Sequence, residues 1–81
     1  MEDADILARL TVICRKVFNL PDAKIDVETN AEIIEEWNSL SHLILIDQVE
    51  REFSVQFSLG DLMDLKSIGD LISLVQRKLQ P

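Results

Sequence analysis

The stretch that decides the fold runs Glu36-Trp37-Asn38-Ser39-Leu40-Ser41-His42-Leu43-Ile44-Leu45-Ile46-Asp47-Gln48-Val49-Glu50-Arg51-Glu52-Phe53. From Ser39 onward its apolar residues recur at helical spacing, and its charges are concentrated after Asp47. This pattern predicts an amphipathic helix from Ser39 to about Phe53.

Two further segments have the same helical periodicity. The first runs from about Asp3 to Phe18 and ends at Pro21, because proline cannot continue the hydrogen-bonded ladder. The second runs from Ser67 to about Leu79. Both have acidic residues near the start and basic residues in the last turn, which suits the helix dipole.

The segments between these helices are shorter or irregular. Ser58 and Ser67 are each followed three residues later by Asp, as at capped helix starts, so a short helix should begin after Ser58. A long loop should cover residues 19–38, with a possible capped turn from Thr29 to Glu32. Isolated apolar residues could hold this loop against a core: Ile25, Val27, Ile33, Ile34 and Trp37.

We therefore expect an all-α fold, a four-helix bundle with three long helices, a short third helix and a long first loop, in a single domain spanning residues 1–81. With 47% apolar residues, the chain can fill one core without disulfides. Its single cysteine, Cys14, lies among apolar residues and should be buried.

The net charge of −7 argues against nucleic-acid binding and favours basic partners. The acidic start lacks the features of a secretion signal, and no stretch approaches the ~20 apolar residues that span a bilayer, so we expect a cytoplasmic protein.

No catalytic site or metal site is expected. Ser39 and His42 lie three residues apart, but no acidic neighbour is placed to orient the histidine as a base. One histidine, one cysteine and dispersed carboxylates offer no metal-ligand spacing. Two glycines, Gly60 and Gly69, do not make a phosphate-binding loop.

Local sequence leaves two readings of Ser39 open. Its hydroxyl could cap the second long helix. Alternatively, Asn38 could be the cap, which would leave Ser39 at the first helical position with its hydroxyl free.

The run Glu36-Trp37-Asn38-Ser39-Leu40-Ser41-His42-Leu43, followed by Val49-Glu50-Arg51-Glu52-Phe53 and by Ser67-Ile68-Gly69-Asp70-Leu71, resembles the acyl carrier protein family. The resemblance spans most of the chain. In that family an Asp-Ser-Leu motif opens the second helix, a Leu-Glu-Glu-Glu-Phe-like run closes it, and a Val-Gly-Asp-like triplet starts the fourth.

The resemblance implies a freestanding carrier, not an enzyme, with 4′-phosphopantetheine from coenzyme A attached covalently to Ser39 by a phosphopantetheinyl transferase. Acyl groups would be held as thioesters and delivered to partner enzymes of fatty acid or polyketide biosynthesis with basic or apolar docking surfaces. The family usually has Asp before the serine, whereas this chain has Asn38, which removes a negative charge at the site of transfer.

Partner recognition should involve the face of the second helix that points away from the core. At about 100° per residue, Leu40 and Ile44 lie on that face near Asp47 and Arg51, so both should be exposed. We predict a recognition surface formed by Asn38, Leu40, Ile44, Asp47 and Arg51. His42 points toward the core side and is a candidate for the entrance to an acyl pocket, although a plain packing role is also open, and Trp37 is expected to be a packing residue.

The sequence leaves open three alternatives to an acyl carrier. The chain could be a small helical adaptor that holds a partner peptide in an apolar groove. It could be a carrier-like regulatory subunit without the modification. Its cargo could also be an amino acid, as in aminoacyl or peptidyl carriers. We expect a monomer.

Overall fold

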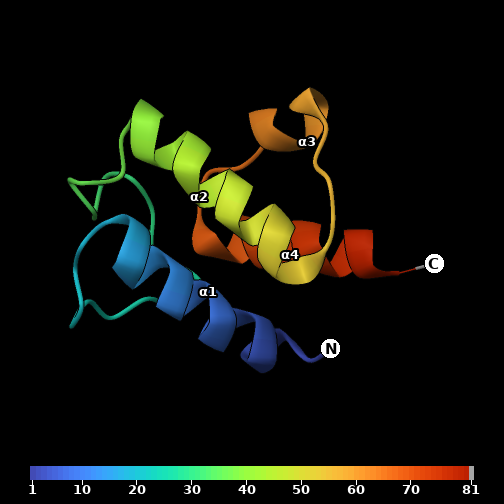
Figure 1. The fold of residues 1–81 in the computed structure, drawn as a ribbon, viewed down its shortest axis with the longest axis horizontal. Helices are drawn as coiled ribbons and strands as arrows, with labels where there is room; N and C mark the ends of the chain where they lie inside the picture. The colour runs from blue at the N-terminus through green and yellow to red at the C-terminus, as the bar shows by residue number, and fades with distance from the viewer. Residues whose placement is uncertain (81) are drawn as a thin grey trace.

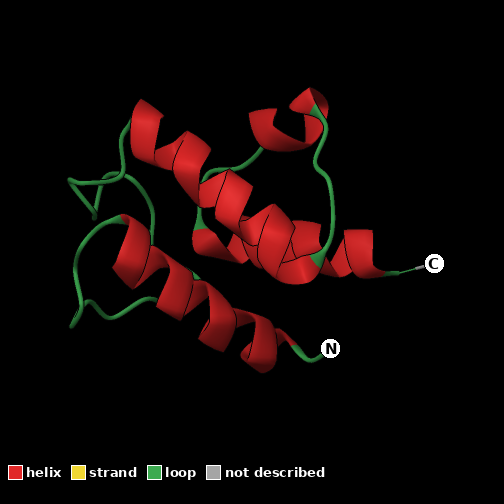
Figure 2. Cartoon of the chain, in the orientation of Figure 1, coloured by secondary structure: helices red, strands yellow, loops and turns green. Residues whose placement is uncertain are grey.

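The computed structural model describes residues 1–80 and contains four helices, with no strand among those residues. The predicted domain extends to Pro81, which lies outside the described residues. The helices are α1 (Asp3–Val17), α2 (Ser39–Phe53), α3 (Leu59–Met63) and α4 (Ile68–Leu79). The all-α prediction of three long helices and a short third one is confirmed (Figure 2).

The three long helices form the body of the fold. α1 packs against both α2 and α4, while α3 lies to one side of α2 as a single short helix (Figure 1). One apolar face of each long helix points inward, as the periodicity of the sequence predicts. The largest fully buried side chains are Ile6, Leu10, Leu45, Ile68 and Leu71.

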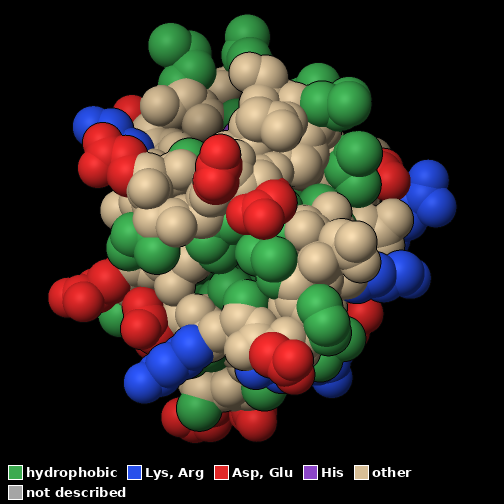
Figure 3. All heavy atoms as spheres, turned by 90° about the vertical axis from the view of Figure 1, so that its left-hand side faces the viewer, with side chains coloured by type: hydrophobic (Ala, Val, Ile, Leu, Met, Phe, Trp, Pro, Cys, Tyr) green, Lys and Arg blue, Asp and Glu red, His purple; other side chains and the backbone are tan. Residues whose placement is uncertain are grey.

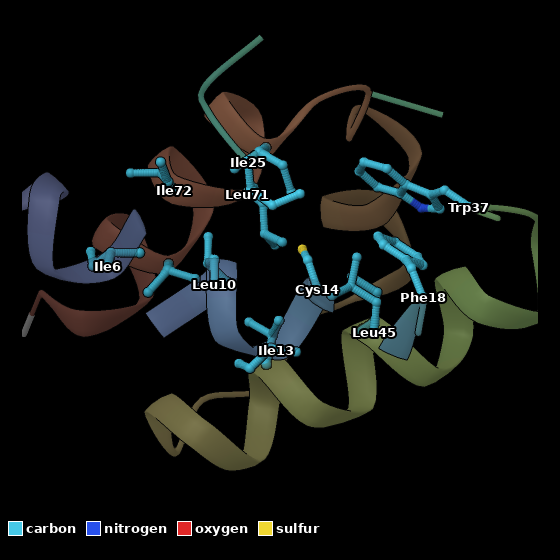
Figure 4. Close-up of a cluster of buried hydrophobic side chains, with 14 of the residues drawn as sticks. Ile6, Leu10, Ile13, Cys14, Phe18, Ile25, Trp37, Leu45, Leu71 and Ile72 are labelled. Carbon is cyan, nitrogen blue, oxygen red and sulfur yellow. The ribbon is translucent and has the colours of Figure 1, made fainter. Parts of the chain in front are cut away.

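Figure 4 shows how α1 lies at the centre of this core, with side chains of α2 and α4 converging on it. Cys14 of α1 points into the cluster beside Leu45 of α2 and is fully buried. Burial raises the pKa of the Cys14 thiol to about 12, because the thiolate would lose its hydration there. The expected buried cysteine is confirmed.

The long first loop is held by both side chains and backbone. Ile25, Ile34 and Trp37 are buried as predicted, whereas Val27 and Ile33 are exposed. These two expectations were wrong, because Val27 is held by its backbone carbonyl group and Ile33 lies in a turn that points its side chain into water.

Val27 and Thr29 contribute through their carbonyl groups, which accept hydrogen bonds from the first N–H groups of α4. The Gly69 N–H donates to Val27 O at 2.9 Å, and the Ile68 N–H donates to Thr29 O at 2.9 Å. A Cβ at Gly69 would come within 3.0 Å of Val27 O, which explains why glycine suits this position. The loop thereby satisfies donors that a helix start leaves unpaired.

The capped turn expected at Thr29 begins one residue later. Asn30 Oδ1 accepts from the backbone N–H groups of Glu32 and Ile33, at 2.9 and 3.1 Å, and no helix forms there. The Thr29 hydroxyl is instead buried and accepts from the Asp26 N–H at 2.9 Å. Asn30 takes the cap because Thr29 is already engaged on the preceding turn.

Candidate functional site

The start of α2 is capped by Asn38. Its side-chain oxygen accepts hydrogen bonds from the backbone N–H groups of Leu40 and Ser41, both at 3.0 Å. Ser41 completes a capping box, because its Oγ accepts from the Asn38 N–H at 2.8 Å and donates to Glu36 O at 2.7 Å. The two side chains on either side of Ser39 therefore fix the first turn of the helix.

This arrangement leaves Ser39 as the first residue of α2, in an exposed position. Among residues 1–80 its hydroxyl has no hydrogen-bond partner, so of the two readings the one with Asn38 as the cap is correct. The oxygen lies at the positive end of the helix dipole, where an attached phosphate group would be stabilised.

Trp37 and His42 lie beside this serine and contact one another. The indole Nε1–H donates to His42 Nδ1 at 3.0 Å, and the two rings stack with centroids 6.1 Å apart and an interplanar angle of 18°. Partial burial lowers the pKa of His42 from its ordinary value, because the imidazolium loses hydration. His42 thus packs against Trp37 as a neutral acceptor, and its Nδ1 is not free to act as a base for Ser39.

An open hollow of about 560 Å³ adjoins Ser39. A second hollow shares three lining residues with it, namely Ala31, Trp37 and His42, and extends toward Leu65 and Lys66 after α3. His42 therefore lines both hollows, including the one next to Ser39. The first hollow is lined by Ala31, Trp37, Asn38, Ser39, His42 and Leu43.

The outward face of α2 carries apolar side chains in water. Leu40 and Ile44 are 69% and 45% exposed, as the helical wheel predicts. Leu43 is 64% exposed and belongs to the same surface, although the periodicity groups it with the apolar residues of the helix. It lies one turn after Leu40, and this spacing of three residues was the signal available in the sequence.

Figure 3 shows separate hydrophobic side chains along the upper edge of the molecule, the end at which Figure 1 places the start of α2 and α3, with acidic side chains below them. Farther along the helix, Arg51 Nε pairs with Asp47 at 3.2 Å, and both side chains are exposed. The five residues of the predicted recognition surface, from Asn38 to Arg51, are all exposed. Two apolar residues of α3, Leu59 and Met63, are also exposed, although their sequence pattern does not single them out.

The comparisons with known proteins identify the family of the chain. The model of a family described as "Phosphopantetheine attachment site" matches residues 8–75. The chain belongs to this family. The chain is also similar to the solution structure of the holo acyl carrier protein from Geobacter metallireducens, with 44% identity, a TM-score of 0.84, and coverage of 90% of this chain and 84% of that one. No curated protein matched in a separate search.

Membership of the family establishes the type of protein. The chain is a carrier and not an enzyme, and its cofactor is a covalently attached 4′-phosphopantetheine. The geometry fits that group, because the start of α2 offers an exposed hydroxyl that bonds to none of residues 1–80. Within residues 1–80, no helix is long and apolar enough to cross a membrane, and no cluster of three metal-ligating side chains occurs.

Proposed function

We propose that this protein is an acyl carrier and that Ser39 is its attachment residue. The observation that carries the proposal is the free hydroxyl at the first position of α2, within a family of phosphopantetheine-attachment domains. Asn38 and Ser41 supply the caps that this helix start needs, so Ser39 is not required for folding.

The reaction at Ser39 requires a phosphopantetheinyl transferase. The Ser39 oxygen attacks the coenzyme A phosphorus that bears the pantetheine arm, and a new P–O bond forms. The P–O bond of the pyrophosphate breaks, adenosine 3′,5′-bisphosphate leaves, and the serine proton passes to a base on the transferase. The carrier needs no base of its own, which is consistent with a His42 Nδ1 already occupied by Trp37.

Acyl groups are the cargo that we favour, bound as thioesters to the thiol at the end of the arm. The structurally similar protein of 44% identity is named as an acyl carrier protein, which supports an acyl cargo over an amino acid. Fatty acid and polyketide synthesis both use such carriers. An aminoacyl carrier would have the same attachment chemistry, so enzymatic loading must distinguish the two.

The partner-recognition surface that we propose comprises Asn38, Leu40, Ile44, Asp47 and Arg51. Leu40 and Ile44 supply the exposed apolar contacts that interface cores use. The Asp47–Arg51 pair partly cancels its own charge, which leaves apolar contact as the main attraction on this face. The net charge of −7 favours docking surfaces with basic rims, and we expect a cytoplasmic monomer.

The test of attachment is the intact mass after incubation with coenzyme A and a promiscuous phosphopantetheinyl transferase. We expect a gain of one phosphopantetheine group in the wild type and none in Ser39→Ala, with matching circular dichroism spectra. No gain in the wild type with several transferases would contradict the carrier proposal and favour the unmodified regulatory subunit or the adaptor.

A further inference from the structure

The hollow at Ser39 and the neighbouring hollow both reach the buried core at Trp37, and the second also touches Leu65, which is half-buried against the core. Among the side chains that line them, Trp37 is the one that belongs to the buried core cluster. Trp37 is 6% exposed, whereas Ala31 and Leu43 on the walls are exposed. A chain that entered through the hollow at Ser39 would therefore meet the Trp37 indole as the one buried core side chain on its walls.

The indole is held on both of its sides. On the outer side it donates to His42 Nδ1 at 3.0 Å and stacks on the imidazole. On the inner side its ring lies 5.5 Å from that of Phe18, at an interplanar angle of 32°. Moving the indole would break a partly buried hydrogen bond and two ring contacts, so this position resists displacement.

The space behind the indole is filled by tightly packed side chains. Phe18 lies next to Trp37 in the close-up of the core, with Cys14 and Leu45 beyond it (Figure 4). Cys14 and Leu45 are fully buried. A long acyl chain could enter only by displacing atoms of a close-packed interior, which proteins tolerate poorly.

We propose that Trp37, positioned by His42, closes the interior on the Ser39 side and is a determinant of cargo specificity. The cargo then stays outside the bundle, so the carrier suits short or polar acyl groups. A long apolar chain gains no shelter here, and the unfavourable exposure of its surface to water grows with its length. The inference rests on the proposed attachment at Ser39.

The test compares melting temperatures of the protein loaded directly from acetyl-, octanoyl- and dodecanoyl-coenzyme A by a promiscuous transferase. Intact mass confirms each loading, so a failure of attachment is distinguished from a failure of this inference. We expect the same melting temperature for all three wild-type forms. In Trp37→Ala we expect dodecanoyl loading to raise the melting temperature by roughly 5 °C or more over acetyl loading, because the opened core can bury the chain.

Ile33→Ala is the matched control, because it truncates an exposed apolar side chain of the same loop. It should show the insensitivity of the wild type. Trp37→Leu provides the same comparison if Trp37→Ala does not fold. A melting temperature that rises with chain length in the wild type would overturn the inference, and so would Trp37 variants that fold but remain insensitive to chain length.

Discussion

Three helices of this protein begin near a serine, and the serines are used in two different ways. Ser58 and Ser67 are caps: the Oγ of Ser58 accepts from the Asp61 N–H at 3.1 Å, and that of Ser67 accepts from the Asp70 N–H at 3.3 Å. Ser39 is instead the first residue inside its helix, α2, and Asn38 occupies the capping position before it.

The hydroxyl groups of Ser58 and Ser67 are used to cap helices, whereas the hydroxyl group of Ser39 is available for modification. A capping serine uses its oxygen to satisfy the helix and is held close to the backbone. A serine at the first helical position, behind a cap of another type, keeps the favourable electrostatic setting of the helix start without that constraint. Substitutions at these serines should therefore affect stability and modification differently.

The largest effect on stability should come from breaking the cap beside Ser39. Asn38→Ala removes the acceptor for two backbone N–H groups and should cost about 1–2 kcal/mol, measured by urea unfolding. Asn38→Asp is the matched control, because a carboxylate keeps the acceptor and adds a favourable charge at the helix start. If Asn38→Ala unfolded at the wild-type urea concentration, Asn38 would not be the cap.

A smaller effect should distinguish Ser67 from Ser39. Ser67→Ala removes a capping oxygen and should cost about 1 kcal/mol, while Ser39→Ala should change stability by less than about 0.5 kcal/mol, because its hydroxyl bonds to no residue of the described chain. Thermal unfolding of both variants measures the difference. Equal losses would show that Ser39 also serves as a cap.

The smallest effect should be a pH dependence between about pH 7 and pH 5 that arises near Ser39. Near Ser58, the hydrogen bond with Lys78 lowers the pKa of the Asp61 carboxyl to about 2, so that group titrates only below this range. Burial lowers the pKa of His42 below 6.5, so the unfolded state binds the proton more readily than the folded state. The stability from neutral His42 is therefore complete above about pH 6.5 and is lost as the pH falls from there through the lowered pKa. Protonation would also place a second donor against the Trp37 N–H.

Melting temperatures measured between about pH 7 and pH 5 test this dependence. His42→Gln is the control, because its amide oxygen can accept the indole N–H but does not titrate in this range. The other charged groups beside His42 are Glu32 and Lys66, which line the same hollow. A wild type and a His42→Gln variant with identical pH profiles would contradict the account.

Most of the fold was predictable from periodicity. The second helix has the predicted bounds, Ser39 to Phe53, and the fourth differs by one residue because Ser67 is its cap. The exposure of Leu40 and Ile44 followed from the same spacing. These features depend on local sequence and on which face is apolar, so a single sequence contains them.

Contacts between distant segments were not predictable. No local pattern shows that the Gly69 N–H donates to Val27 O, or that the Trp37 indole donates to His42 while packing on Phe18. The choice between Asn38 and Ser39 as the cap also stayed open, since both residue types suit that position. The hollow beside Ser39 is formed by contacts of this kind, so no local pattern predicts it.

The central claim is that Ser39, and neither Ser58 nor Ser67, bears the phosphopantetheine arm. The most direct measurement is fragmentation mass spectrometry of the protein after transferase treatment, which assigns the added mass to one residue. The account predicts that all of the added mass lies on Ser39, and that Ser58→Ala and Ser67→Ala are modified as the wild type is. Added mass on Ser58 or Ser67, or undiminished modification of Ser39→Ala, would contradict it.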